Sequence, residues 1–126
     1  MPYLYSPGQY AESVAQIRDD AFLHRRPLSH FEWALYLPLI MGDTYESALT
    51  RAQAGLTRSY GPRMQELAAD VAAIGTAQDV AERLAEYVEA GVRHFVFGHI
   101  GPESVLPQAQ LLIDEVAPML RRGIRL

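Results

Sequence analysis

The 126-residue chain contains no cysteine, which excludes disulfides, thiolate nucleophiles and cysteine metal sites. Lysine is absent as well, since every basic residue is an arginine, and Schiff-base or lysine general-base chemistry within the chain is therefore excluded. No apolar run approaches the roughly 18 residues of a membrane span, and no signal-type segment opens the chain. We therefore expect a cytoplasmic protein without a membrane partner.

A basic surface is also missing. The formal net charge is −4, and acidic and basic residues are interleaved along the chain, so nucleic acid is not an expected partner. Hydrophobic residues make up 49% of the sequence, which is enough to form a core. The length predicts a single domain over residues 1–126.

Helix and strand signals alternate along the chain. The segment "PYLYSP" predicts a short first strand, and Ser6 followed by Pro7 is typical of a helix start. "FEWALYLPLIM" predicts a strand buried on both faces, "VAAIG" a short strand and "VRHFVF" a last strand followed by the turn "GHIGPES". Helices are expected between these strands and at the end of the chain, over residues 10–23, 44–60, 62–70, 77–90 and 105–121.

Caps mark the ends of two of these helices. Asp43, with Glu46 three residues later, predicts the start of one helix, and Gly61 its end. Thr76, with Asp79, predicts the start of another helix that stops at Gly91.

This alternation predicts an α/β fold of about four parallel strands with helical crossovers. No glycine-rich dinucleotide fingerprint and no P-loop follows a strand, which disfavours an open nucleotide-binding sheet. Four strand–helix units correspond to half of an eight-stranded barrel.

The stretch "GTAQDVAERLAEYVEAGVRHFVF", followed by "EVAPMLR", resembles the C-terminal signature of the luciferase-like monooxygenases, which are flavin- or deazaflavin-dependent oxidoreductases built on a TIM barrel. "PYLYSPGQYAESVAQIRDDA" is similar to the segment after their fifth strand, and "FEWALYLPLIMGDTYESALTRAQAGLTRSYG" to their sixth strand and its helix. The resemblance implies the C-terminal half of a (β/α)8 barrel, a truncated domain with the fifth to eighth units, and FMN or a deazaflavin as cofactor.

In such barrels the active site lies at the carboxyl ends of the strands, and the loops after the seventh and eighth strands often bind phosphate. Carried over by position, these loops begin at Gly75-Thr76 and Gly98-His99. The amides and hydroxyl of the helix start at Thr76 suit a cofactor phosphate, although plain helix capping explains Thr76 equally. His99 is a candidate to hydrogen-bond a flavin or substrate, and a solvent-facing loop histidine is the alternative.

Tyr5 and Ser6 follow the presumed fifth strand, and the resemblance implies contacts to flavin or its phosphate there. For Ser6 the alternative is a helix cap. Asp43 is read as a cap rather than a catalytic base, and Trp33 as core or interface packing rather than part of a cofactor box.

No catalytic residue and no metal site can be assigned. His94 lies at the beginning of its strand and is read as structural. His24 and His30 have no metal-ligand spacing to a carboxylate pair.

The resemblance leaves two functional classes open. The chain is either part of a flavin or deazaflavin oxidoreductase, acting as an oligomer or beside a separate N-terminal half, or a non-catalytic remnant with a structural or interaction role. Half a barrel exposes two strand edges, so we expect self-association, with a homodimer as the simplest form.

Overall fold

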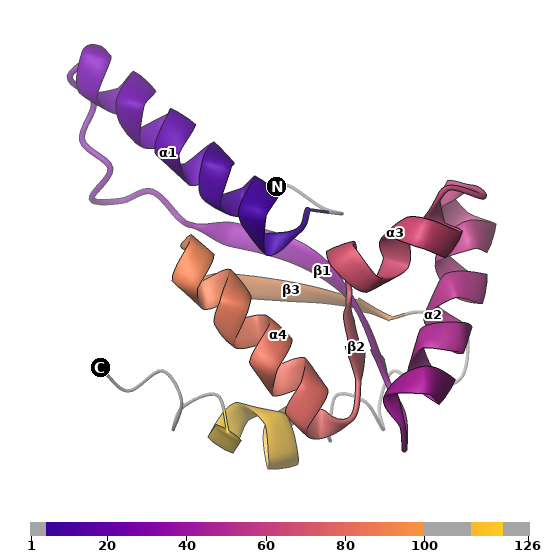
Figure 1. The fold of residues 1–126 in the computed structure, drawn as a ribbon. Coiled ribbons are helices and arrows are strands. Elements are labelled where there is room, and N and C mark those ends of the chain that lie inside the picture. The colour runs from indigo at the N-terminus through magenta and orange to yellow at the C-terminus, as the bar shows by residue number, and fades with distance from the viewer. Residues whose placement is uncertain (1–4, 100–111, 120–126) are drawn as a thin grey trace.

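A computed structural model describes residues 5–99 and 112–119, without the side chains of residues 99, 112 and 113. The elements, in chain order, are α1 (Pro7–Leu23), β1 (Ala34–Met41), α2 (Tyr45–Tyr60), α3 (Met64–Val71), β2 (Ala73–Gly75), α4 (Ala77–Ala90), β3 (His94–His99) and the π-helix η1 (Leu112–Val116). None of the described helices is long and apolar enough to cross a membrane. Figure 1 shows α1 and α4 packed along one side of β1 and β3.

The three strands form one parallel sheet in the order β2-β1-β3. The predicted class, an α/β partial barrel in which parallel strands alternate with helices, is confirmed. The expected first strand falls on residues 1–4, and most of the expected last helix on residues 100–111 and 120–126, all outside the described residues.

The strand order differs in one respect from that of a closed barrel, in which successive strands follow one another around the sheet. Here β1 is central and pairs with both other strands. The reason is the length of the available edges: β2 offers three residues for pairing, whereas β1 pairs with β3 over six, from Ala34 to Leu39. Each paired residue of a parallel ladder contributes hydrogen bonds, so the longer edge is favoured.

Pro38 lies inside the central strand, a position that proline usually avoids because it lacks an amide donor. The amide of His94 donates to the Trp33 carbonyl, and Gly42 donates to Gly75 on the other side of β1. In a parallel ladder, backbone groups alternate between the two sides, so the Pro38 nitrogen points toward β2. Pairing with β2 begins only at Leu39, and no ladder bond is lost.

Two groups of apolar side chains cover the two faces of β1 near its carboxyl end. Successive residues of a strand point to opposite faces, which separates Leu39 from Ile40. One cluster joins the leucines of β1 to α1, α4 and η1: Tyr10, Leu35, Leu37, Leu39, Met41, Ala73, Val80, Ala81, Leu84, Tyr87, Val92 and Val116. The other joins β1 and β2 to α2 and α3: Ile40, Ala48, Ala52, Leu56, Met64, Ala68, Val71, Ala72 and Ile74. Burial of β1 on both faces, as predicted, holds for Leu37 to Met41.

Several predicted element ends are confirmed. Ser6 caps α1 with Pro7 in the first turn, and Thr76 caps α4. Gly61 and Gly91 follow α2 and α4, both with positive φ.

Two boundaries were wrong. Thr44, and not Asp43, caps α2, because its hydroxyl accepts the Ser47 amide at 3.1 Å. Gly98 and His99 were expected in a turn but belong to β3, where they pair with Pro38 and Leu39 of β1. Pairing with the long strand β1 therefore extends β3 two residues beyond its predicted end.

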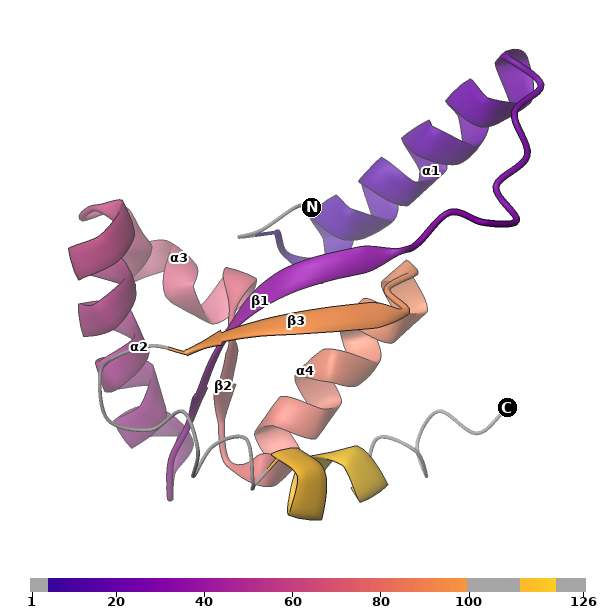
Figure 2. The same ribbon diagram turned by 180° about the vertical axis from the view of Figure 1, so that it is seen from behind.

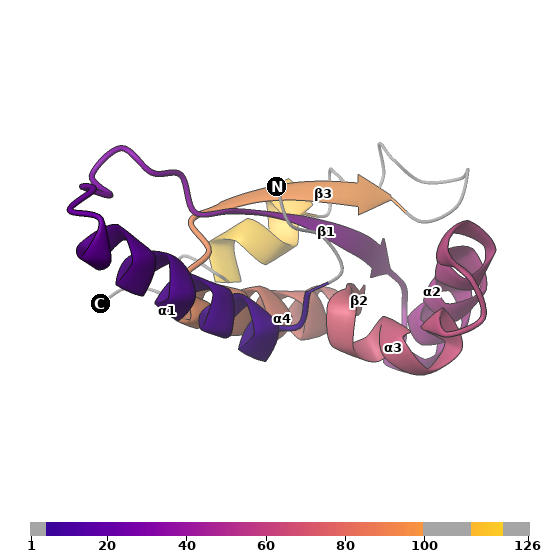
Figure 3. The same ribbon diagram turned by 90° about the horizontal axis from the view of Figure 1, so that it is seen from above.

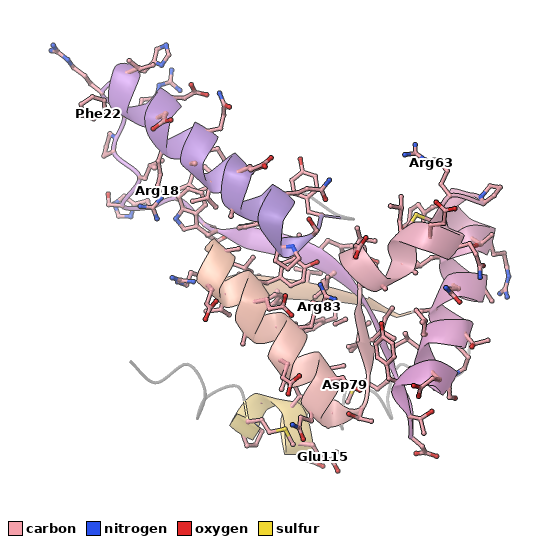
Figure 4. The ribbon with its side chains drawn as sticks, viewed as in Figure 1. Arg18, Phe22, Arg63, Asp79, Arg83 and Glu115 are labelled. Carbon is pink, nitrogen blue, oxygen red and sulfur yellow. The ribbon has the colours of Figure 1, made fainter. Side chains whose placement is uncertain are left out.

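Two tyrosines attach α1 to the rest of the molecule. The Tyr10 hydroxyl donates to the Ala34 carbonyl at 3.1 Å, and the Tyr87 hydroxyl of α4 donates to the Tyr5 carbonyl. Burial raises the pKa of the Tyr87 phenol well above its usual value, and the nearby Arg83 guanidinium offsets this only in part. The far end of α1 extends beyond the sheet, where Phe22 is 84% exposed (Figure 4).

The raised pKa of Tyr87 predicts a loss of stability in alkali. The folded state holds the phenol neutral, so its contribution is complete below the unfolded pKa of about 10 and is lost as the pH rises above it. We expect the free energy of unfolding to fall between pH 9 and 11, and to fall less in Tyr87→Phe. At pH 7 the same substitution should cost about 1 kcal/mol, because the Tyr5 carbonyl loses its donor.

The measurement is urea unfolding at a series of pH values. Tyr45→Phe, which alters a tyrosine that is 37% exposed, is the matched control and should leave the pH dependence unchanged. Parallel curves for wild type and Tyr87→Phe across pH 9 to 11 would contradict the assignment.

Candidate functional site

The carboxyl ends of β1 and β2 meet at one edge of the sheet. The Gly42 amide, just after β1, donates to the carbonyl of Gly75 at 3.0 Å. Leu39 pairs with Ala73 on one side and with His99 on the other. The two predicted loops, at Gly75 and at Gly98, lie on opposite sides of β1, about 10 Å apart across two strand spacings, and Gly98 is registered three residues, or about another 10 Å, before Gly75 along the strands. We call this the carboxyl edge.

Thr76 and Asp79 form a complete capping box at the start of α4 (Figure 4). The Thr76 amide donates to Asp79 Oδ2 at 3.0 Å, and the Asp79 amide donates to Thr76 Oγ1 at 3.3 Å. Gly75 has a φ of 123°, and a Cβ there would come within 2.5 Å of Asp79 Oδ2. Glycine is thus required by the backbone and by the capping carboxylate.

The Asp79 carboxylate disfavours phosphate binding at the start of α4. An anion about 4 Å from Asp79 would be repelled by about 1 to 4 kcal/mol per unit charge in a solvent-accessible site. A helix start attracts an anion by only about 0.3 to 1 kcal/mol. The start of α4 therefore suits a neutral part of a ligand better than a phosphate.

The ring of Tyr36 packs over one face of Gly98. A Cβ on Gly98 would lie within van der Waals overlap of the Tyr36 hydroxyl and of its ring carbon Cζ, which is 2.5 Å away. Tyr36 pairs with Val96, so its ring reaches diagonally across to Gly98. An aromatic ring that covers a glycine on a neighbouring strand helps to fix strand register.

Tyr5 and Ser6 lie away from the carboxyl edge. The Tyr5 carbonyl accepts from Tyr87, which is ten residues, or about 15 Å, along α4 from its start. Ser6 forms a capping box with Gln9, in which its amide donates to Gln9 Oε1 at 2.8 Å and its hydroxyl accepts from the Gln9 amide at 3.2 Å. The structure places Gly75 and Thr76 at the end of β2 and Gly98 and His99 at the end of β3, on opposite sides of β1, and it places Tyr5 and Ser6 at neither end.

Arg51 is a residue of the carboxyl edge that the sequence reasoning missed. It extends from α2, and its Nη2 donates to the Met41 carbonyl at 2.9 Å. A Cβ on Gly42 would come within 2.5 Å of the same nitrogen, so glycine makes room for the guanidinium. In the structure Arg51 is half-buried beside Ala52, on the side of α2 that faces the sheet, and no local sequence pattern marks it. A guanidinium has further donors, which suit a phosphate.

Grooves among the described residues include one that reaches the carboxyl edge at Ile74 and Asp79 and one that follows α1. One, of about 160 Å³, lies between α3 and α4, and its polar lining is mostly acidic: Tyr45, Ala69, Ala72, Ile74, Asp79, Glu82, Arg83 and Glu86. Arg83 is already engaged, because it donates to the Ala69 carbonyl at 2.8 Å (Figure 4). The other, of about 460 Å³, follows α1 and includes Tyr5. Neither groove offers a cationic lining for a phosphate.

Within the described part of the chain, no three histidine, aspartate or glutamate side chains lie close enough to hold a metal ion. The side chain of His99 is outside the description, so its predicted role stays a prediction. The roles proposed for Tyr5, Ser6, Gly75, Thr76 and Gly98 likewise stay predictions.

Comparison with known proteins shows the fold. No protein-family model matches the sequence, and no curated protein does. An F420-dependent secondary alcohol dehydrogenase, solved in complex with an F420-acetone adduct, matches 94% of this chain and 42% of its own with a TM-score of 0.69 and 18% identity. The coenzyme F420-dependent tetrahydromethanopterin reductase of Methanopyrus kandleri matches 94% and 44%, with a TM-score of 0.68 and 14% identity.

A third structure, a riboflavin lyase with modified FMN and riboflavin, matches 98% of this chain and 39% of its own, with a TM-score of 0.63 and 18% identity. The chain therefore spans about two fifths of the length of each of these structures. All three are luciferase-like TIM-barrel proteins, so the predicted resemblance to part of such a barrel is confirmed at the level of the fold.

The contact between Tyr36 and Gly98 can be tested by substitution. Gly98→Ala should lower the free energy of unfolding by about 1 to 3 kcal/mol, because the new methyl group displaces the Tyr36 ring. Tyr36→Ala should remove most of this penalty, so that the double mutant is more stable than the sum of the single effects predicts. Chemical denaturation of the four proteins measures the coupling, and additive effects would show that the two residues do not interact.

Proposed function

We propose that this chain is the cofactor-binding C-terminal part of a flavin- or deazaflavin-dependent oxidoreductase. The observation that carries the proposal is the likeness of nearly the whole chain to three structures whose names include F420 or FMN. F420 is a deazaflavin, and both cofactor types carry out redox chemistry on their ring. The protein would then supply binding and orientation, and the cofactor the electrons.

The residues of the carboxyl edge offer such a cofactor a positive charge at one position and a negative charge at another. Arg51 offers a positive charge at the end of β1, beside Gly42, whose lack of a side chain makes room for the guanidinium. Asp79 disfavours an anion at the start of α4. We therefore assign the phosphate to Arg51, and we assign to Gly75, Thr76, Gly98 and His99 contacts with the uncharged parts of the cofactor.

Activity would require more than this chain. The chain spans about two fifths of the matched structures, and we propose that a second copy or a separate N-terminal half supplies the other strands of a barrel. The substrate pocket would be completed by the same partner. An oxidoreductase or monooxygenase activity is thus proposed for the assembly and not for one copy alone.

A second function is favoured by the capping boxes. Ser6, Thr76 and Asp79 already use their side chains to satisfy helix starts, as structural residues do. A non-catalytic module with a structural or interaction role would need nothing more from them. Cofactor binding separates the two functions.

The deciding experiment is a fluorescence titration of the purified protein with FMN and with F420. Saturable binding of either, at one cofactor per chain or per dimer, would support the oxidoreductase. A folded protein, checked by circular dichroism, that binds neither at 100 µM would support the non-catalytic module.

Arg51 provides a sharper test within the same titration. Arg51→Gln should weaken cofactor binding by about tenfold or more, because a charge-assisted hydrogen bond to phosphate contributes about 1.5 to 3 kcal/mol. Arg51→Lys keeps the charge and should weaken binding less. The shorter glutamine side chain does not reach the Met41 carbonyl, so a loss of stability of about 1 kcal/mol is expected and is checked by urea unfolding. Equal affinities for all three proteins would remove Arg51 from the site.

Thr76→Asn separates capping from ligand contact. Asparagine caps helices as well as threonine does, so the variant should unfold at the same denaturant concentration as wild type. If the Thr76 hydroxyl contacts the cofactor, the dissociation constant should rise several-fold. An unchanged constant would leave Thr76 with a capping role only.

A further inference from the structure

β3 lies at the border of the sheet, with β1 on one side (Figure 3). Within residues 5–99 and 112–119, no strand pairs with its other side. A free strand edge presents unpaired amide and carbonyl groups, to which another strand can bind. The closed barrels that this chain resembles have no such edge.

The directions of the backbone groups of β3 follow from its pairing with β1. The His94 amide donates to the Trp33 carbonyl at 3.1 Å, and His94 is registered with Ala34. Backbone groups alternate along a parallel strand, so those of Val96 and Gly98 also point toward β1. The amides and carbonyls of Phe95 and Phe97 therefore point outward, and they form the free edge.

The free edge lacks the features that keep edge strands from associating. No proline and no charged residue occurs from Phe95 to Gly98, although natural edges commonly carry one or the other. The rings of Phe95 and Phe97 are stacked at 5.6 Å between centroids, half-buried against the first apolar cluster. The core thus continues to the border of the sheet.

We infer that the β3 edge binds the β3 edge of a second copy, antiparallel, about a two-fold axis at Val96. In this register Phe95 of each chain exchanges both hydrogen bonds with Phe97 of the other, and Val96 faces Val96 of the second copy. Aromatic rings in facing positions stabilise such pairs. All four outward-pointing residues of the two strands are then satisfied.

Charge also favours an identical partner in this orientation. Two identical strands bring like charges together wherever a charged residue faces itself, but the axis falls in an uncharged segment. Arg93 and His94 of one chain fall opposite His99 and Gly98 of the other, and not opposite each other. With histidine neutral, as at pH 7, the register therefore sets no two like charges opposite each other.

Such a dimer has a joint sheet of six strands, three from each copy. Figure 2 shows the strands of one copy from the face opposite α4. The two carboxyl edges lie at opposite ends of that sheet, so each copy keeps its own edge and no barrel is closed. The inference goes beyond the proposed function, because this dimer does not complete a barrel and does not require cofactor binding. Dimer formation and cofactor binding can therefore fail separately.

Cysteine cross-linking tests the axis, because the chain contains no cysteine of its own. Residues in a non-hydrogen-bonded antiparallel pair have Cα atoms about 4.5 Å apart, within the range of about 4.4 to 6.8 Å that a disulfide allows. Val96→Cys should therefore form an intermolecular disulfide under mild oxidation. Sedimentation of the wild type, without cofactor, should give twice the mass of one chain.

Two controls bracket this result. Ala54→Cys, on the exposed side of α2, reports random collision, and Ala34→Cys, on the same sheet face as Val96 but one strand farther in, reports face-to-face packing. Val96→Cys should cross-link at least tenfold faster than either. A wild type that is monomeric at 50 µM, or a dimer in which Val96→Cys reacts no faster than Ala54→Cys or Ala34→Cys, would overturn the inference.

A charge swap gives an independent test if Val96→Cys does not fold. Val96→Lys and Val96→Glu should each be monomeric, because like charges would meet at the axis. An equimolar mixture of the two should restore the dimer mass. Dimers of either variant alone would overturn the assigned register.

Discussion

The structure depends on one constraint, the pairing of β1 on both of its sides while both of its faces are buried. β1 provides the six-residue ladder for β3 and the three-residue ladder for β2. Its leucines form the cluster with α4, and Ile40 belongs to the cluster with α2 and α3. β1 carries no charged residue, so its side chains can be buried on both faces while its backbone pairs with β2 and β3. The carboxyl edge exists because the ends of β1 and β2 are held together there.

Glycine and arginine shape that edge together. Gly42 and Gly75 are linked by a backbone hydrogen bond, and each lacks the Cβ that would collide with Arg51 or with Asp79. The positive side chain of Arg51 therefore lies at the end of β1, and the negative side chain of Asp79 lies at the end of the adjacent β2. For a cofactor with a charged phosphate and an uncharged ring, this arrangement defines two unequal positions. Under the proposed function, this electrostatic difference, and not the number of donors, would decide which position takes the phosphate.

The second constraint is that the described three-stranded sheet does not close into a barrel. The likeness to TIM-barrel proteins covers nearly all of this chain but about two fifths of theirs, and the described sheet accordingly has a free edge at β3. In a closed barrel that edge would be paired. Phe95 and Phe97 bring the core to this border, where another chain can cover it.

The sequence by itself determined the elements whose signals are local. Ser6 with Pro7, Thr76 with Asp79, and Gly61 and Gly91 mark helix ends through hydrogen bonds that close within a few residues. Only the tertiary structure decided which strand pairs with which, that β3 extends through His99, and that Arg51 reaches the carboxyl edge while Tyr5 and Ser6 do not. These outcomes depend on edge lengths and on contacts between residues far apart in the chain, which no local pattern encodes.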